Sequence, residues 1–267
     1  MNGFLIRALL VVFAWLVLAF LLIPVFVVVP MSFSASNYLQ FPPSEWSLRW
    51  YQAFFGSFEW MRAAKNSLIV AIATVLIATP IGFLAAYKLH RTEGWPHALL
   101  FGWLLGPQLM PVILLSIGVF FLYIRLNLVD TFTGIVLADV ALAVPFVLTT
   151  CMAGLARVDH HLEFAARSLG ASKIRAIIDV VIPQMKISLF AGALFAFVSA
   201  LDEVVIGLLI AGGDRTILTR QMFMSLREQI DPTIAAVSSL LIMISLIAVA
   251  MFVVTQHNAI RRTTNNN

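Results

Sequence analysis

Charged residues are scarce in this chain of 267 residues. Asp, Glu, Lys and Arg together make up only 11% of the sequence, whereas 61% of it is hydrophobic. A soluble domain is typically about a quarter charged and about half apolar. A soluble fold of this composition would have too little polar surface to cover itself. We therefore predict that membrane lipid surrounds much of the protein.

Cysteine is almost absent, and the common catalytic motifs are missing. Cys151 is the only cysteine, which excludes an internal disulfide, and no Cys/His cluster indicates structural zinc. The sequence has no Gly-x-x-x-x-Gly-Lys-Ser/Thr, Gly-x-Ser-x-Gly or His-Glu-x-x-His segment. We expect this chain to bind no cofactor and no nucleic acid, and not to hydrolyse ATP by itself. Adjacent His160 and His161 point to different faces of a helix, so we expect no metal there either.

Six long apolar runs are what the sequence does contain, at residues 5–29, 66–87, 98–123, 132–152, 187–211 and 233–255. One helical span uses about 20 apolar residues. The first run is longer than the roughly 7–15 apolar residues of a signal peptide, so it is expected to stay as a span. We predict a single transmembrane domain over residues 1–267, all-α, with about six transmembrane helices. External segments are expected near residues 32–65 and 212–232, and a polar loop at 153–186.

The loop charges predict the orientation. Six spans place both termini on one side, and the loops and termini of that side carry a net charge of +6. The loops of the other side carry only +1. An excess of Lys and Arg marks cytoplasmic loops, so both termini and the loop 153–186 are predicted to be cytoplasmic. In the first external segment, Ser47 is a plausible N-cap of an interfacial helix, which could also form part of a docking surface.

The polar loop has the pattern of two short helices. Asp159 can cap the first, Glu163 lies near its first turn, and Gly170 is placed where a helix commonly ends. Ser172 can start the second helix, which Pro183 interrupts. The apolar positions of the first helix recur at steps of three and four: Leu155, Val158, Leu162, Ala165, Ala166 and Leu169. Periodicity alone fits equally a helix lying on the bilayer and a docking surface for a protein.

The residues of this loop resemble the "EAA" loop of ABC importer permeases. That family pattern is Glu-Ala-Ala, three residues, Gly, then nine residues before a hydrophobic-x-hydrophobic-Pro ending. Here the matching segments are Glu163-Phe-Ala-Ala166, Gly170 and Val180-Val-Ile-Pro183. Phe164 and Ile182 are mild departures. Asn66-Ser-Leu68 and Pro145-Phe146 resemble further family features, so the resemblance covers nearly the whole chain.

The resemblance implies the type I ABC importer permease fold and a set of partners. In that family the loop forms a coupling helix, which inserts in a cleft of the ATP-binding subunit. The residues implied to couple to the ATPase are Asp159, Glu163, Ala165, Ala166, Gly170 and Pro183. The implied partners are a second permease, expected to be non-identical, two ATP-binding subunits that carry ATP and Mg, and an external substrate-binding protein. The implied location is the bacterial inner membrane.

Asp139, Asp202 and Glu203 are the acids inside the predicted spans. Ionisable groups there are costly and usually face a bundle interior or a watery path. They could pair structurally, or they could line a path that attracts cationic groups. Segments 199–205, 220–223 and 231–236 resemble the polyamine, opine and aminoethylphosphonate branch of the family, particularly the second permease of spermidine/putrescine importers. This resemblance implies an amine-bearing solute, although Asp139 has no matched family counterpart.

Two other classes of function fit the same residues. A secondary transporter driven by an ion gradient could use Asp139, Asp202 or Glu203 as proton sites. A membrane scaffold without transport activity could recruit a cytosolic protein through the polar loop. Uptake that depends on ATP and on partner subunits, and not on an ion gradient, separates the ABC permease from these two classes.

Overall fold

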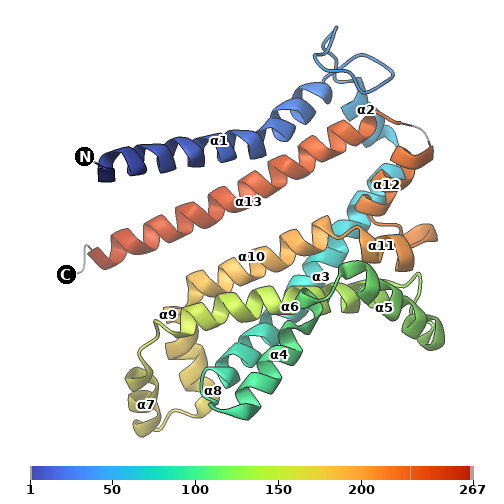
Figure 1. Cartoon of the computed structure of the whole chain (residues 1–267). Helices are drawn as coiled ribbons and strands as arrows, with labels where there is room; N and C mark the ends of the chain where they lie inside the picture. The colour runs from blue at the N-terminus through green and yellow to red at the C-terminus, as the bar shows by residue number, and fades with distance from the viewer. Residues whose placement is uncertain (1, 229, 265–267) are drawn as a thin grey trace. The chain divides into compact units, whose positions relative to one another are not determined.

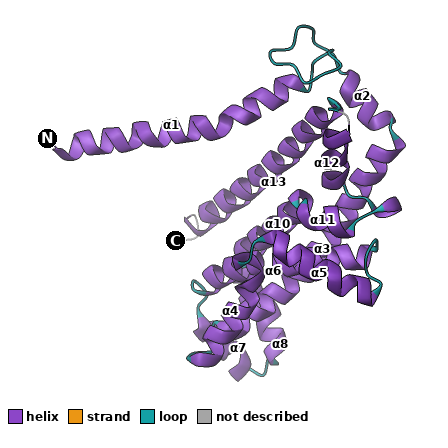
Figure 2. Ribbon diagram, turned by 45° about the vertical axis from the view of Figure 1, so that its right-hand side comes forward, coloured by secondary structure: helices purple, strands orange, loops and turns teal. Residues whose placement is uncertain are grey.

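The computed structural model describes residues 2–228 and 230–264, and nearly all of them are helical (Figures 1 and 2). Within these described ranges there is no β-strand, and the one piece of β pairing is an isolated bridge between Ser34 and Trp46. The predicted all-α class is therefore confirmed.

The helices follow one another with short connections. In the N-terminal half they are α1 (Asn2–Met31), α2 (Arg49–Gly56), α3 (Phe58–Leu89), α4 (Trp95–Leu109), α5 (Val112–Leu126) and α6 (Phe132–Leu155). In the C-terminal half they are α7 (His160–Ser168), α8 (Lys173–Ala176), the π-helical η1 (Ile177–Val181), α9 (Ile182–Gln184), α10 (Lys186–Asp202), α11 (Val205–Ile210), the 3-10 helix η2 (Gly213–Arg215), α12 (Leu218–Glu228) and α13 (Thr233–Thr264).

Two compact units divide the chain. Unit 1 comprises Met1–Met61 and Met222–Ile247, and unit 2 comprises Arg62–Gln221 and Ala248–Asn267. In unit 1 the segment after α1 folds back on itself, because Ser32 and Tyr51 share a hydrogen bond of 2.7 Å and Arg49 donates to the carbonyl of Ala35. Ser47 accepts from the backbone N–H of Arg49, but the N-cap position of α2 is Leu48, one residue later than predicted.

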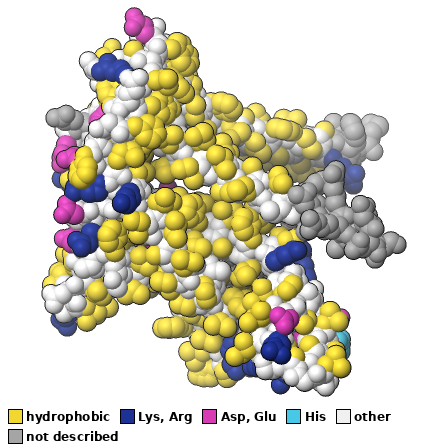
Figure 3. Space-filling view, turned by 180° about the vertical axis from the view of Figure 1, so that it is seen from behind, with side chains coloured by type: hydrophobic (Ala, Val, Ile, Leu, Met, Phe, Trp, Pro, Cys, Tyr) yellow, Lys and Arg dark blue, Asp and Glu magenta, His cyan; other side chains and the backbone are white. Residues whose placement is uncertain are grey.

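Four described helices are long and apolar enough to cross a membrane, and six spans result if two bent helix pairs each count as one. The four are α1, α3, α6 and α13. On the face shown in Figure 3 hydrophobic side chains predominate, and the charged side chains gather in a few groups. This arrangement fits about six spans surrounded by lipid.

The third predicted span is not one straight helix. Helices α4 and α5 are bent by 99° to each other, with Met110 and Pro111 between them. Pro111 has no N–H to donate and disfavours helical geometry in the residue before it, and Met110 is indeed extended (φ −92°, ψ 144°). The span predicted over 98–123 is therefore a broken helix, and the proline is the physical reason.

The fifth predicted span is also interrupted. Helix α10 ends at Asp202 and α11 begins at Val205, and the Glu203 carboxylate accepts a 2.9 Å hydrogen bond from the backbone N–H of Ile206. Just before α10 the chain bends by 82° between Lys173–Gln184 and Lys186–Asp202. Pro183 lies beside this bend, as its predicted helix-interrupting role requires.

Helix α6 forms the centre of unit 2, where small residues let helices approach closely. A Cβ atom added to Gly82 of α3 would lie 2.6 Å from Cβ of Val147, and one added to Gly192 of α10 would lie 3.2 Å from Cα of the same valine. Small residues at helix contacts are typical of packing in membranes. The buried core therefore holds α3, α6 and α10 together through close backbone approach.

Candidate functional site

The loop after α6 folds as its sequence pattern predicts. Asp159 is the N-cap of α7, and its carboxylate accepts a 2.9 Å hydrogen bond from the backbone N–H of His161. Gly170, after the end of α7, has a φ of +95°, which glycine adopts readily. Ser172 caps α8 by accepting from the N–H of Arg175. The predicted start and end of the first helix and the start of the second are thus confirmed.

Helix α7 presents its apolar side chains to the outside. Leu162 and Phe164 are each at least half exposed, and Leu169, which follows the helix, is 89% exposed. Ala165 is exposed and Ala166 is half-buried. An amphipathic helix normally turns its apolar side chains toward the protein core. The apolar residues of α7 are therefore free to contact something outside this chain.

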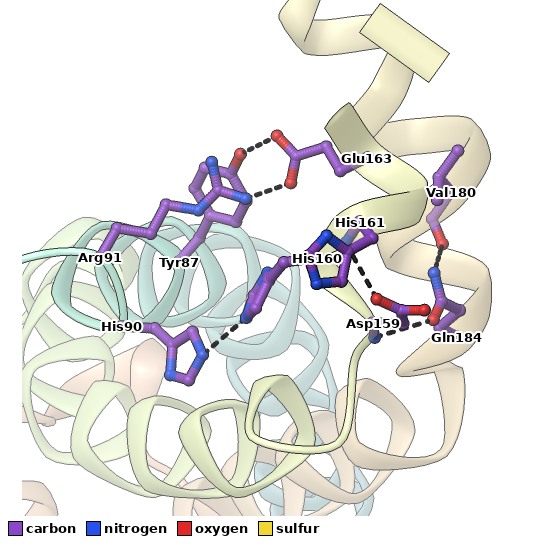
Figure 4. A network of polar contacts seen from close by, with 9 residues as sticks. All are labelled: Tyr87, His90, Arg91, Asp159, His160, His161, Glu163, Val180 and Gln184. Carbon is purple, nitrogen blue, oxygen red and sulfur yellow. Dashed lines mark hydrogen bonds and ion pairs between the residues drawn. The ribbon is translucent and has the colours of Figure 1, made fainter. Parts of the chain in front are cut away.

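The one buried residue of α7 is an acid. Glu163 has no exposed surface, and its carboxylate accepts a 2.8 Å hydrogen bond from the hydroxyl of Tyr87 and forms an ion pair with Arg91 (Figure 4). The Arg91 guanidinium also lies over the Tyr87 ring, 4.2 Å from its centre. The Glu163 carboxylate thus faces the end of α3 and is not part of the exposed surface of α7, and the implied role of Glu163 in coupling to the ATPase stays a prediction.

Two further contacts hold the start of α7. The Nε2 atoms of His90 and His160 are 2.9 Å apart, so one ring donates a hydrogen bond to the other. The backbone N–H of Asp159 donates to the Gln184 side chain at 3.3 Å, and Gln184 in turn donates to the carbonyl of Val180. Figure 4 shows these contacts together. They connect α7 to the end of α3 on one side and to the bend beside Pro183 on the other.

The surroundings of Glu163 and His90 favour one charge state of each. Burial alone would raise the pKa of the Glu163 carboxyl, but the hydrogen bonds from Arg91 and Tyr87 and the charges of Arg91 and Arg167 outweigh burial and lower it. Burial lowers the pKa of His90 below its ordinary 6.5, and the neighbouring His160 and Arg91 add to this. Glu163 is thus held ionised, and His90 is held neutral.

The three intramembrane acids have different surroundings. Asp139 lies on α6 and is only 2% exposed, and its Oδ2 atom is buried without a hydrogen-bond partner. Glu203 is half-buried at the break between α10 and α11, and it interacts electrostatically with Asp139. Asp202 is exposed at the end of α10. The structure thus brings Asp139 and Glu203 near each other, while Asp202 lies at the protein surface.

Sequence reasoning missed the residues that hold these elements in place. Tyr87, His90 and Arg91 were assigned only to the end of a span, although their spacing puts them on one face of a helix. Thr219 donates a 2.8 Å hydrogen bond to the carbonyl of Glu203, and Arg220 donates to the carbonyls of Gly207, Leu208 and Ala211 at the end of α11. A cation at the C-terminal end of a helix is favourable, but the local sequence does not indicate which helix end Arg220 will contact.

The chain is similar to known transport proteins along most of its length. The profile described as "Binding-protein-dependent transport system inner membrane component" matches residues 78–262. The spermidine/putrescine transport system permease protein PotC of Haemophilus influenzae is 27% identical over 240 residues, which cover 90% of this chain and 93% of that protein. The putrescine transport system permease protein PotI of Escherichia coli is 27% identical over 230 residues, covering 84% and 82%.

A solved structure shows the same fold. It is that of a bacterial alginate ABC transporter in complex with an alginate pentasaccharide-bound periplasmic protein. One of its chains matches with a TM-score of 0.69 at 13% identity, over 98% of this chain and 96% of that chain. At this low identity the likeness concerns the fold alone.

Proposed function

Since the chain belongs to the inner membrane components of binding-protein-dependent transport systems, and is therefore an ABC importer permease subunit, we propose that it passes a small amine-bearing solute inward across the bacterial inner membrane. A polyamine such as spermidine or putrescine is the first candidate. An opine, an amino-acid-like compound or an aminoethylphosphonate is the alternative within the same role. The observation that carries the solute class is the similarity to PotC and PotI over more than four-fifths of the chain.

The exposed apolar residues of α7 support a docking role. The helix is capped at Asp159, stops at Gly170 and leaves Leu162 and Phe164 exposed. In this proposal Ala165, Ala166 and Gly170 meet a separate ATP-binding subunit, which carries ATP and Mg. Glu163 contributes indirectly by fixing the orientation of α7, and Pro183 contributes at the bend that leads into α10.

The intramembrane acids support a cationic solute. Asp139 keeps a buried carboxylate oxygen without a partner, and Glu203 lies at a break between two helices. Buried carboxylates are costly unless a positive group compensates them, and an ammonium group passing nearby would do so. Asp202, exposed at the end of α10, would meet the solute at the edge of this path. The fold does not by itself set the charge of the solute, because the fold neighbour imports an acidic polysaccharide.

The proposed assembly has two permeases, expected to be non-identical, with two ATP-binding subunits and an external substrate-binding protein. In this proposal both termini and α7 lie in the cytoplasm, which the net charge of +6 against +1 on the loops and termini of that side supports. ATP binding would close the ATP-binding subunits and displace α7. That displacement would open the path outward, where the binding protein delivers its solute. Such a change requires different contacts in the two states.

Uptake by the reconstituted complex tests the proposal. Proteoliposomes would contain the two permeases and the ATP-binding subunits, with ATP enclosed and the binding protein and labelled spermidine or putrescine outside. We expect uptake that needs ATP and persists when ion gradients are collapsed. Uptake driven by a gradient in liposomes holding this chain alone would reject the ABC role in favour of a secondary transporter. ATP-driven uptake of a different amine would leave the role intact and change the solute.

Docking has a separate test. Gly170→Asp, or a bulky residue at Ala166, should abolish co-purification of the ATP-binding subunit while the chain still inserts into the membrane. Gly170 is chosen because its φ of +95° strains any other residue, and Ala166 because it lies half-buried on α7. Unchanged co-purification in both variants would count against α7 as the docking element.

A further inference from the structure

The attachment of α7 to the rest of unit 2 is polar. Among the residues of α7, only Glu163 is buried; its partner Tyr87 lies in the last turn of α3, and its partner Arg91 lies two residues beyond the end of α3. His160 adds a contact to His90, from the same face of α3. A helix held by a few directional side-chain contacts follows the element that supplies them, provided these contacts stay intact. We name Tyr87, Arg91 and Glu163 the α3–α7 clamp.

The two partners of Glu163 in the clamp are themselves restrained. The Tyr87 ring lies in the buried core, with the Arg91 guanidinium 4.2 Å and the Lys173 ammonium 5.9 Å from its centre. The backbone continues its helical hydrogen bonding past α3, since the N–H of His90 donates to the carbonyl of Ala86. The α3 side of the clamp is therefore fixed, so any motion of α7 relative to α3 requires the clamp contacts to change.

The opposite end of α3 is also tied to its surroundings within unit 2. Arg62 forms an ion pair with Asp214, and the Asn66 side chain donates 2.9 Å hydrogen bonds to the carbonyls of Asp214 and Thr216. Ser67 accepts a 2.7 Å hydrogen bond from the N–H of Leu218. One residue further along, Thr219 holds the carbonyl of Glu203, at the break between α10 and α11. These contacts join α3 to the segment predicted to be external.

Helix α3 therefore links two sites far apart in space. It is one continuous helix of 32 residues through Pro80, which at 1.5 Å per residue is about 48 Å long. At one end it holds α7, and at the other it holds the segment next to Glu203. Coupling over such a distance can be carried by a rigid element whose two ends are both engaged.

We propose that Tyr87 and Arg91 are positioning residues of the transport cycle: by clamping Glu163 they make α7 and α3 move as one body, so that a displacement of α7 reaches the external end of α3. The proposal rests on the proposed docking of an ATP-binding subunit on α7. It differs from a merely local anchoring role in one respect. Loss of the clamp should uncouple the two ends of α3 while docking persists, because the exposed face of α7 does not include the clamp.

The test measures a nucleotide-dependent change at the external end of α3, and it needs no knowledge of the solute. The full complex carries Cys151→Ala, which removes the only cysteine, and Arg215→Cys, which places an exposed thiol in the segment held by Asn66. The rate of maleimide labelling is compared with and without ATP plus vanadate.

Tyr87→Phe removes one donor and keeps the ring, and Arg91→Gln removes the charge. Tyr38→Phe and Arg125→Gln are the matched controls, since both side chains are exposed and neither belongs to the clamp.

The expected outcome separates the clamp from the docking proposal. In the two clamp variants the ATP-binding subunit should still co-purify, while the nucleotide-dependent change in labelling rate should fall by about ten-fold, within the range usual for coupling between sites. The control variants should keep the full change. An unchanged response in both clamp variants overturns the clamp alone. Absence of the ATP-binding subunit from the unmodified complex overturns the docking proposal and the clamp with it, and loss of the subunit only in the clamp variants reduces the clamp to local anchoring.

Discussion

The centre of unit 2 and its cytoplasmic helix are held by different kinds of interaction. Around Val147, α3 and α10 approach α6 so closely that Gly82 and Gly192 leave no room for a side chain. Helix α7 instead relies on one buried carboxylate, a histidine pair and the hydrogen bond from Asp159 to Gln184. Close packing resists any displacement, whereas a few directional contacts can be made and broken as a set. The comparison therefore predicts a rigid bundle whose connection to α7 depends on a few side chains, so that substitutions there should uncouple α7 without disturbing the bundle.

The largest effect should come from filling the close approach in the rigid part. In Gly82→Val the new Cβ would lie 2.6 Å from Cβ of Val147, so backbone must shift. Overpacking of this kind costs about 1–3 kcal/mol or more, and we expect a lower thermal unfolding temperature and a lower yield in detergent. Gly102→Ala is the control, because nothing lies within 4 Å of its added Cβ. Equal stability of both variants would show that the bundle is not closely packed at Val147.

The next effect concerns the clamp. Glu163→Gln removes the charge that pairs with Arg91 but keeps the size of the side chain. Hydrogen bonds to charged groups contribute about 1.5–3 kcal/mol, so amide hydrogen exchange in residues 160–168 should accelerate by ten-fold or more. Exchange in the core of α6 should stay unchanged. If exchange rose throughout unit 2 instead, the helix would not be separable from the bundle.

A pH effect of moderate size should appear at the histidine pair. Burial, together with the neighbouring His160 and Arg91, lowers the folded-state pKa of His90 from 6.5. The stability that depends on neutral His90 is therefore present above that ordinary value and is lost as pH falls from it through the lowered pKa. Exchange in α7 should therefore rise as pH falls below about 6.5. His90→Gln, which removes the titrating ring, should flatten this dependence. Glu163 does not contribute to it above pH 4.5, the ordinary pKa of its carboxyl, because its pKa is also lowered.

The smallest effect should come from the helix cap. Asp159→Ala removes the side chain that accepts from the N–H of His161, which costs about 1 kcal/mol at a typical N-cap. Exchange at the first turn of α7 should rise by a few-fold, while Asp159→Asn, which can still accept, should retain most of the protection. Equal effects of the two substitutions would mean that charge, and not capping, is what Asp159 supplies.

Local features of the site could be predicted from the sequence, but its long-range contacts could not. Asp159, Gly170 and Ser172 act on backbone groups within a few residues, so their roles follow from residue type and position. Tyr87 and Arg91 meet Glu163 across 76 and 72 residues of sequence, and no local pattern encodes that meeting. The burial of the Glu163 carboxylate against Tyr87 and Arg91 could not be predicted for this reason.

The difference between local patterns and long-range contacts also explains which parts of the fold could be predicted. Hydrophobic runs gave the number of spans because lipid demands about 20 apolar residues for each. They did not reveal the breaks at Met110 and Glu203, because apolar residues continue on both sides of each. Pro111 signalled the first break, but a proline in a membrane helix is often accommodated. The coupling and pathway roles of the candidate residues remain predictions.

Cross-linking from α7 tests most directly that its exposed face docks an ATP-binding subunit. In a Cys151→Ala background, Ala165→Cys places a thiol on that face, and Arg125→Cys places one at the end of α5 predicted to lie across the membrane. Each is labelled with a photoactivatable maleimide in the assembled complex. We predict that illumination joins the ATP-binding subunit to the Ala165→Cys variant and not to the Arg125→Cys variant. Cross-linking of the ATP-binding subunit from Arg125→Cys, or from neither position, would contradict the account.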